Sequence, residues 1–532
     1  MTDVLIIGSG GAGLTAALKA KELGASVIIA GKTYPTHSQT SMAQGGINAS
    51  LANVESDSVE AHIADTIKSA QGLCDEAMVR TMCTQAPQTI AWLERLGVPF
   101  SRLDNGGVGT QTIAQRQMGG ASAKRACYAQ DYTGLKILHT LYDTCLKEEI
   151  EFLDEHYLLN LIVEEAAVKG ATFLDIRTGE VKQIDAKSVI IATGGYGSLY
   201  HGYTTNAYGA SGDGIAAVLR AGGAVSDMEF IQFHPTALKH SGILISESAR
   251  GEGGYLVNSQ GERFVDELKP RDVVARAIFK EFQKGLEVFL DLRHLGEAKL
   301  LELLPQEIAL CKLHERIDPA CELIPIKPVA HYCMGGIEVD NQLRVSALRG
   351  CYAVGECANA KIHGANRLGG NSLLEITTFG AIAAQNAVHY AAQHQVKEAD
   401  EAQLTQDRHT LETLFNQEHD INFYEHREAL GKLLYENVGI IRDNVQLTEA
   451  MQAVSIMQSQ TIQMGLADKN PTNNTHLIDF LEFKNAMMLA ALIIKAALQR
   501  DESRGAHFKI GFESANDAMF KHSITLSKET EV

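Results

Sequence analysis

The feature that most constrains the fold is a glycine-rich turn between an apolar strand and an Ala/Leu-rich helix at the start of the chain. The segment VLIIGSGGAGLTAALKAKELGASVIIAG, residues 4–31, reads as strand, turn, helix and second strand. Gly8, Gly10 and Gly13 form GxGxxG at the head of that helix, where bare backbone and the helix N-terminus can receive a pyrophosphate. A tight turn without a ligand is the alternative reading. The agreement of strand, spacing and helix favours the βαβ unit of a dinucleotide-binding sheet.

The end of the second strand indicates which dinucleotide is bound. NAD proteins usually place an acidic residue there for the ribose, but here VIIA continues into Gly31 and Lys32. Two distant apolar segments, SVIIATGG at 188–195 and CYAVGE at 351–356, are expected to be further strands of the same sheet. A minimal NAD site would not need them, so the pattern favours the longer FAD.

Length and composition bound the class of protein. A chain of 532 residues is too long for one core, so two to four domains are expected. The net charge of −18 argues against a nucleic-acid partner, and an anionic substrate would need a local cationic pocket. The nine scattered cysteines contain no CxxC pair, which fits neither a disulfide framework nor an iron-sulfur site, and we expect no metal site.

The N-terminus and the hydropathy pattern predict a cytoplasmic chain. The first strand starts at Val4, which leaves no room for a signal peptide, and no apolar run approaches the roughly 18 residues of a membrane span.

The domain organisation is predicted from changes in sequence texture. We predict an α/β Rossmann-like FAD-binding domain with an inserted α+β capping domain, followed by a helical domain. The predicted boundaries are 1–225 and 338–400 for the FAD-binding domain, 226–337 for the capping (substrate) domain, 401–510 for the helical domain and 511–532 for a C-terminal tail. From about residue 375 the pattern is helical, with an Ala/Glu/Asp/Gln-rich linker expected near 396–406. The chain after Arg504 is too irregular to assign.

An ordered series of motifs resembles one family. The series is PTHSQTSMAQGGI (35–47), RACYAQDYTG (125–134), SGDG (211–214), QFHPT (232–236), SESARGEGG (246–254), RDVVAR (271–276), HYCMGGI (331–337) and HGANRLGGNSLLE (363–375). In this order it resembles the flavoprotein subunits of succinate dehydrogenase and fumarate reductase, over about residues 1–510. The resemblance implies an FAD enzyme that interconverts succinate and fumarate.

The resemblance also implies the residues that contact FAD. They are Gly8, Gly10, Gly11, Ala12, Gly13, Lys32, Ser38, Gln39, Thr40, Gln44, Gly45, Gly46, Ala192, Thr193, Gly194, Asp213, Glu356, Asn371, Ser372 and Leu373.

One departure from the family pattern concerns the flavin link. Gln39 stands where the family carries the histidine that bonds covalently to the flavin, and His37 stands where the family has an arginine. An amide cannot form that bond, so we predict noncovalent FAD. Attachment through His37 is the alternative, but a two-residue shift along an extended segment moves a side chain by roughly 6 to 7 Å. Loss of the covalent bond is also expected to lower the flavin potential and to favour fumarate reduction.

A four-carbon dicarboxylate requires two anion-binding ends, and the planar guanidinium of Arg binds a carboxylate bidentately. Arg367 is the candidate for one end. By resemblance, His331 shares its carboxylate, while His234 and Ser246 bind the other; the family usually has threonine at the Ser246 position. Either histidine could instead be a satisfied core residue.

Dehydrogenation removes a hydride from one carbon and a proton from its neighbour. The resemblance implies that Arg271 transfers the proton, and that Glu247 and Arg250 connect it to solvent. A plain ion-pair network at the cap surface is the alternative for these three residues.

No cysteine cluster or haem motif is present to take electrons from the flavin, so an iron-sulfur partner subunit is implied. In the family that partner joins membrane anchors and quinone, which would place this chain at the cytoplasmic face of the membrane. Two alternatives stay open. L-aspartate oxidase is a relative with noncovalent FAD and a similar length, and a noncatalytic FAD-binding or assembly protein would retain the scaffold without turnover.

Overall fold

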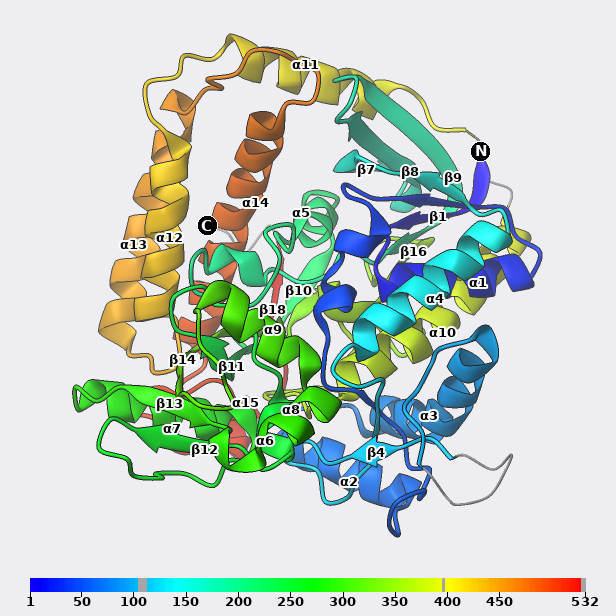
Figure 1. Ribbon diagram of the computed structural model, residues 1–532. Coiled ribbons are helices and arrows are strands. Elements are labelled where there is room, and N and C mark those ends of the chain that lie inside the picture. The colour runs from blue at the N-terminus through cyan, green and yellow to red at the C-terminus, as the bar shows by residue number, and fades with distance from the viewer. Residues whose placement is uncertain (104–111, 395–397, 528–532) are drawn as a thin grey trace.

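The computed structural model describes residues 1–103, 112–394 and 398–527. Its centre is a sheet in which segments far apart in the sequence lie side by side (Figure 1). The strands, in spatial order, are β6 (Glu151–Leu153), β2 (Val27–Ala30), β1 (Thr2–Ile7), β9 (Val181–Ile191), β8 (Ala167–Asp175) and β7 (His156–Glu164), with β16 (Cys351–Ala353) also paired to β9. The expected grouping of the three distant apolar strands in one sheet is confirmed, since β1 and β16 both run parallel to β9.

The long strand β9 joins two kinds of pairing. Its C-terminal half, up to Ile191, is parallel to β1 and β16, whereas its N-terminal half, from Val181, is antiparallel to β8. Parallel strands are usually buried on both faces, and β1 is accordingly apolar and buried along almost its whole length. The covering helices are α1 (Gly11–Glu22), α4 (Thr133–Lys147), α10 (Asn371–Gln393) and, beyond α10, α3 (Glu76–Leu96) and α2 (Val59–Ser69).

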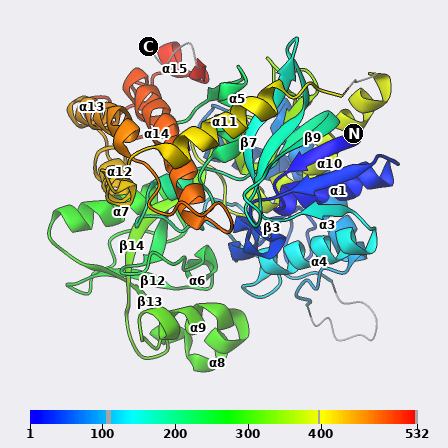
Figure 2. The ribbon, with the colours of Figure 1, turned by 90° about the horizontal axis from the view of Figure 1, so that it is seen from above.

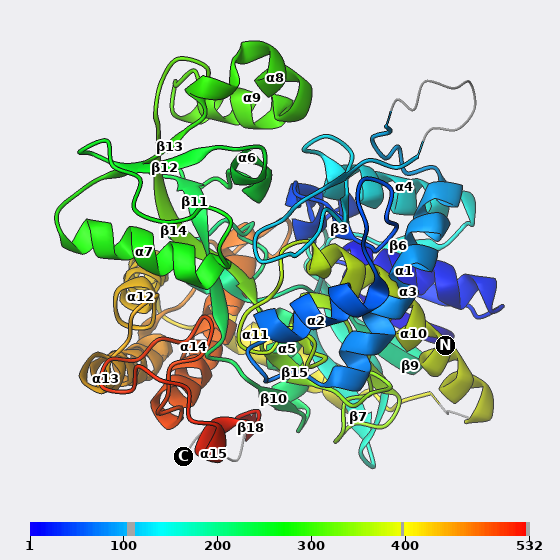
Figure 3. The same ribbon diagram turned by 90° about the horizontal axis from the view of Figure 1, so that it is seen from below.

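The inserted segment forms a separate antiparallel sheet with its own apolar core (Figure 1, green). Its strands are β11 (Ile231–Leu238), β14 (Ile324–Cys333), β13 (Val288–Asp291) and β12 (Tyr255–Asn258). Its helices are α6 (Glu247–Gly251), α7 (Arg271–Gln283), α8 (Glu297–Leu303) and α9 (Pro305–His314). Figures 2 and 3 show α8 and α9 standing together at one end of this cap.

The C-terminal part is helical, as predicted from about residue 375 onward. Helices α12 (Phe423–Asn437), α13 (Asn444–Gln460) and α14 (Thr475–Gln499) pack together at the left of Figure 1, and α11 (Ala402–Asn416) lies across their top. The predicted linker is wrong for 402–406, because α11 already begins at Ala402. Residues 395–397 lie outside the described part of the chain. No helix within 1–103, 112–394 and 398–527 is long and apolar enough to cross a membrane.

A small sheet lies where the predicted domains meet. It contains β17 (Ala358–Asn359), β15 (Gly336–Glu338), β10 (Ala224–Ser226) and β18 (Thr525–Ser527), in that order. The predicted boundaries at 225/226 and 337/338 fall inside β10 and β15, and β18 joins the sheet from the predicted tail, which also contains α15 (Asp517–Phe520). The division into domains stays a prediction.

Candidate active site

A cavity of about 370 Å³ lies at the carboxyl ends of the parallel strands. Its lining begins where β1, β2, β9 and β16 end, at Ile7, Ala30, Ala192 and Val354. In open α/β sheets this edge is where ligands bind.

Most of the predicted FAD contacts line this cavity. They are Gly8, Gly10, Gly11, Ala12, Lys32, Ser38, Gln39, Thr40, Gln44, Gly45, Gly46, Ala192, Thr193, Gly194, Asp213, Glu356, Ser372 and Leu373. Gly13 and Asn371 stand outside the lining. A Cβ on Gly13 would meet the Gly8 carbonyl oxygen at 2.0 Å, so Gly13 serves the close packing of α1 on β1. The Asn371 side chain turns away to bond Asn48 and His62.

The glycine turn forms a bare backbone wall at the start of α1. Gly8 has a φ of +112°, and a Cβ there would meet the Ala192 carbonyl oxygen at 2.2 Å. The N-cap of α1 is Gly10, which offers no side-chain acceptor, and the first turn carries no acidic residue. An N-terminus of this kind binds anions through its N–H groups and the helix dipole.

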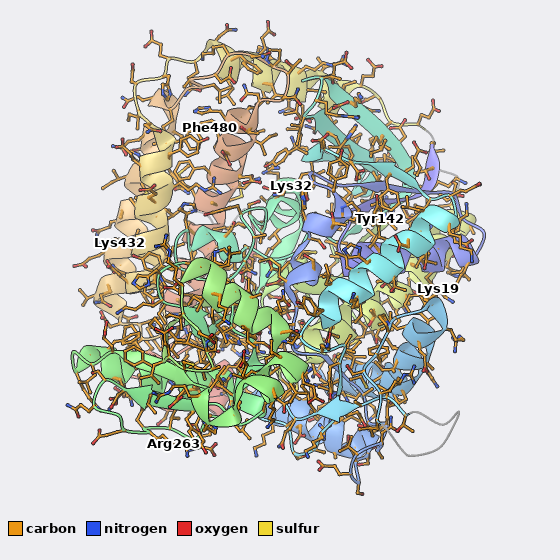
Figure 4. All side chains as sticks on the ribbon, viewed as in Figure 1. Lys19, Lys32, Tyr142, Arg263, Lys432 and Phe480 are labelled. Carbon is orange, nitrogen blue, oxygen red and sulfur yellow. The ribbon has the colours of Figure 1, made fainter. Side chains whose placement is uncertain are left out.

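An ion-pair network of Lys32, Asp213 and Glu482 lies beside the cavity, and Lys32 and Asp213 belong to its lining. Lys32 Nζ lies 2.5 Å from Asp213 Oδ2 and 2.7 Å from Glu482 Oε1, and Figure 4 places Lys32 in the middle of the molecule. Asp213 also accepts hydrogen bonds from Tyr157 and Asn485. Burial alone would lower the pKa of Lys32, but its two carboxylate partners raise it well above its ordinary value. The charges here are compensated within the protein.

Several polar atoms of the cavity wall have no partner within the described ranges. They are Ser38 Oγ, Gln44 Oε1 and Thr193 Oγ1, all buried. Buried polar groups are rarely left unpaired, so the wall is built to meet a polar ligand. Glu356 is half-buried; burial raises the pKa of its carboxyl to about 7, although the Cys333 N–H donates to it at 3.0 Å.

Gln39 and His37 occupy different places relative to the cavity. Gln39 lines the cavity and its Oε1 accepts a hydrogen bond from the Ala207 N–H at 2.9 Å. His37 also touches the cavity, but it is an exposed side chain whose ring edge contacts Tyr34. His37 therefore stands at the mouth of the cavity.

The opposite end of the same cavity is cationic. His234, Ser246, Arg271, His331 and Arg367 all line it. They come from the cap strands β11 and β14, from the starts of α6 and α7, and from the loop before α10. The structure thus brings together all four residues predicted to bind the substrate and the predicted proton donor.

The donors at this end lack partners. His234 Nε2 and Arg367 Nε are buried and make no hydrogen bond to any described residue. The described residues therefore satisfy only the Nδ1 atom of His234, and its role stays a prediction. Burial and nearby cations hold the pKa of His234 and of His331 well below the ordinary value. Burial together with Arg271 lowers the pKa of Arg367 to about 10. A bound anion would offset the repulsion between the Arg271 and Arg367 guanidinium groups.

The three predicted relay residues form a continuous chain. Arg271 Nε and Nη2 donate to Glu247 Oε2 at 2.9 and 2.6 Å, and Arg250 Nη2 lies 3.4 Å from Glu247 Oε1. Arg250 itself stands behind Glu247, outside the cavity lining. The alternative of a surface ion-pair network is wrong, because the three side chains are at most 7% exposed. Burial would raise the pKa of Glu247, but Arg271 and Arg250 lower it.

Sequence reasoning missed Gln232 and Tyr332. Gln232 Oε1 accepts from Arg271 Nη1 at 2.9 Å and from Arg367 Nη2 at 3.1 Å, so one amide oxygen joins both arginines. The Arg367 guanidinium stacks on the Tyr332 ring at 4.1 Å. The signal for Gln232 was its place in the QFHPT motif, two residues before His234.

Comparison with known proteins agrees with this geometry. Residues 3–373 match the family model described as "FAD binding domain", and residues 427–532 match "Fumarate reductase flavoprotein C-term". The chain is 39% identical to the 8-methylmenaquinol:fumarate reductase flavoprotein subunit of Wolinella succinogenes, over 98% of this chain and 88% of that one. It is 37% identical to the succinate dehydrogenase flavoprotein subunit of Coxiella burnetii, over 98% and 94%.

Among solved structures, a variant of the E. coli quinol fumarate reductase flavoprotein superposes with a TM-score of 0.92 at 36% identity, over 98% of this chain and 93% of that one. These matches do not favour the L-aspartate oxidase alternative. They extend over nearly the whole chain, cap and helical part included. The chain therefore belongs to the flavoprotein subunit family of fumarate reductase and succinate dehydrogenase.

Proposed function

We propose that this chain interconverts succinate and fumarate as the FAD-carrying subunit of a redox complex. The observation that carries the proposal is a single cavity with two different ends. One end is bare backbone at a helix N-terminus, and the other holds Arg367 and His234 with unpartnered donors. The first suits a pyrophosphate and the second suits carboxylates.

The residues of the first end fit FAD. The Gly8 to Gly11 turn would hold the pyrophosphate, and the Glu356 carboxyl would accept hydrogen bonds from ribose hydroxyls. The unpartnered Gln44 and Thr193 oxygens would meet polar atoms of the cofactor. When bound, FAD would supply the hydride transfer: its reduced form would give a hydride to fumarate, and its oxidised form would accept one from succinate.

We propose further that the flavin is held without a covalent bond. Gln39 occupies the cavity position and already accepts a hydrogen bond from Ala207, which leaves its NH₂ group as a donor to a ligand. An amide is no nucleophile for the flavin. His37 lies at the exposed mouth beside Tyr34.

The second end would orient the dicarboxylate. Arg367 would bind one carboxylate with help from His331, and His234 with Ser246 would bind the other. Neutral imidazoles serve this purpose as hydrogen-bond donors, and Thr205 Oγ1 contacts His331 Nδ1 at 2.7 Å, which fixes that ring. These two groups of side chains would hold the central carbons of the dicarboxylate beside Arg271.

Arg271 would donate the proton at the central carbon. Its guanidinium makes two hydrogen bonds to Glu247, and the second Glu247 oxygen faces Arg250. Reprotonation of Arg271 through Glu247 from Arg250 completes the relay. The three side chains are at most 7% exposed, so the proposed path lies inside the protein and away from bulk water.

An iron-sulfur subunit is the proposed electron partner. The nine cysteines of the chain are all free, and most are buried singly. The relatives named above are subunits of fumarate reductase or succinate dehydrogenase complexes. We propose that this chain likewise reaches a membrane only through its partners, at the cytoplasmic face.

One preparation tests these statements. Purified protein reconstituted with FAD is assayed anaerobically for fumarate reduction by reduced viologen, and with L-aspartate for comparison, and is then precipitated with acid. Fumarate turnover with flavin released into the supernatant is expected. Flavin in the pellet would redirect the attachment to His37, and aspartate oxidation without fumarate reduction would overturn the proposed function.

A further inference from the structure

A buried glutamate of the cap, Glu307, touches the substrate end without belonging to the predicted site. It is the third residue of α9 and is 1% exposed. Its Oε1 accepts a hydrogen bond from the Ser246 N–H at 2.9 Å, and Ser246 lines the cavity and caps α6. Glu307 therefore lies one hydrogen bond behind the proposed binding site for a carboxylate.

Asp131 of the FAD-binding part holds the helix that carries Glu307. Its Oδ2 accepts hydrogen bonds from the Gln306 N–H at 2.7 Å and from the Glu307 N–H at 3.2 Å. These are N–H groups at the start of α9, so a residue outside the cap supplies a helix cap inside it. A series of hydrogen bonds therefore runs from Asp131, through the start of α9, to Ser246. It links the FAD-binding part of the chain to the substrate end of the cavity.

The charge on Glu307 has no direct compensation. Glu307 Oε2, Asp131 Oδ1 and Arg116 Nε and Nη1 are all buried and have no hydrogen-bond partner within the described ranges. The groups that act electrostatically on this region are Asp131 and Tyr132 before α4, Arg116 on β4 (Gln115–Arg116) and Cys311 on α9. Burial and Asp131 raise the pKa of the Glu307 carboxyl to about 8.

We propose that Glu307 is a positioning residue for substrate binding, which holds the Ser246 amide through its neutral carboxyl group and weakens dicarboxylate binding when it ionises. A neutral carboxyl group accepts the Ser246 hydrogen bond without placing a charge at this buried position. An ionised Glu307 would place a negative charge behind a site that binds a dianion. This inference rests on the proposed function, since it needs a dicarboxylate at Ser246.

The test compares the fumarate KM and kcat of the FAD-loaded wild type with those of Glu307→Gln between pH 6.5 and 9.5. In the wild type KM is expected to rise about fivefold from pH 7 to pH 9, the size of a screened like-charge repulsion over roughly 10 Å. In Glu307→Gln the amide keeps the Ser246 acceptor but never ionises, so KM should stay level while kcat matches the wild type. Glu302→Gln, which removes a charge from an exposed position of α8, should follow the wild type.

A second variant separates positioning from charge. Glu307→Leu removes the acceptor, so KM should rise at every pH and kcat should change little; Glu307→Gln restores the low KM. Malonate binding, read from the flavin absorption spectrum, gives the same comparison without turnover. Identical pH profiles of KM in the wild type and Glu307→Gln would overturn the inference and leave the proposed function standing. A wild type that neither reduces fumarate nor binds malonate would overturn the proposed function itself.

Discussion

The two ends of the cavity differ in how their charges are satisfied. At the cofactor end, Lys32 is paired with Asp213 and Glu482 in a network that is complete within the protein. At the substrate end, Arg271 is paired with Glu247, whereas Arg367 forms no ion pair with any described residue. The two arginines share one neutral acceptor, Gln232, and further donors have no partner within the described ranges. The ion pairs at the cofactor end stabilise the folded state. The unpaired donors at the substrate end are free to bind an anion. We propose from this difference that unpaired buried donors, more than charge itself, mark the substrate site.

The largest expected effect is at the substrate end. Arg271→Ala should lower the kcat of fumarate reduction by about 10⁴-fold, because it removes the proposed proton donor. FAD binding should be unchanged, since the cofactor end is untouched, and the flavin absorption spectrum checks this. Turnover within tenfold of the wild type would contradict the relay.

The cofactor end is expected to respond in stability. Lys32→Met would leave Asp213 and Glu482 buried side by side without their cation, which should cost about 3 to 5 kcal/mol of unfolding free energy. Lys19→Met is the matched control, because Lys19 forms only a surface pair with Glu22 and lies at the edge of the molecule in Figure 4. Denaturant unfolding of the two variants measures the difference in unfolding free energy. Equal midpoints for Lys32→Met and Lys19→Met would show that the Lys32 ion pairs do not stabilise the fold.

Gln232 tests whether the two arginines depend on a shared acceptor. Gln232→Leu should lower kcat/KM for fumarate by about 30-fold, the value of hydrogen bonds to charged groups, through both Arg271 and Arg367. Gln183→Leu, on β9 away from the cap, should leave kcat/KM unchanged. An unchanged kcat/KM in Gln232→Leu would show that the arginines are held by other contacts.

The smallest effect concerns stability and pH. The Glu307 carboxyl keeps its proton in the folded state up to a pKa of about 8, whereas in the unfolded chain it loses it near pH 4.5. The folded state therefore binds more protons between these values, and the stability of the wild type should fall as pH rises through this window. Glu307→Gln lacks this loss, so its stability relative to the wild type should increase as pH rises from 4.5 to 8, with no gain at pH 4.5. Thermal unfolding at both pH values decides it, and a gain of equal size at pH 4.5 would point to packing instead of protonation.

Prediction from the sequence succeeded where chemistry follows from local spacing or from motif order. The GxGxxG turn predicted the cofactor wall, because glycine spacing, strand and helix all lie within a few residues. The ordered motifs placed His234, Ser246, Arg271, His331 and Arg367 in one site, and the structure brings them into one cavity. Their individual roles stay proposals. Gln232 was missed although it stands inside the QFHPT motif, because its amide carries no charge and its partners, Arg271 and Arg367, are distant in the chain.

The sequence by itself determined the fold class and the glycine turn at Gly8 to Gly13, since strand, turn and helix follow from local patterns in the chain. The prediction of noncovalent FAD from Gln39 rests on the sequence as well and stays a proposal. Only the tertiary structure decided that Glu482 pairs with Lys32 across most of the chain, that Asp131 caps a helix of the cap, and that Glu307 faces Ser246. The physical reason is that spacing constrains a turn or a strand face directly. A contact between distant residues is set by how whole elements pack, and no local pattern records it.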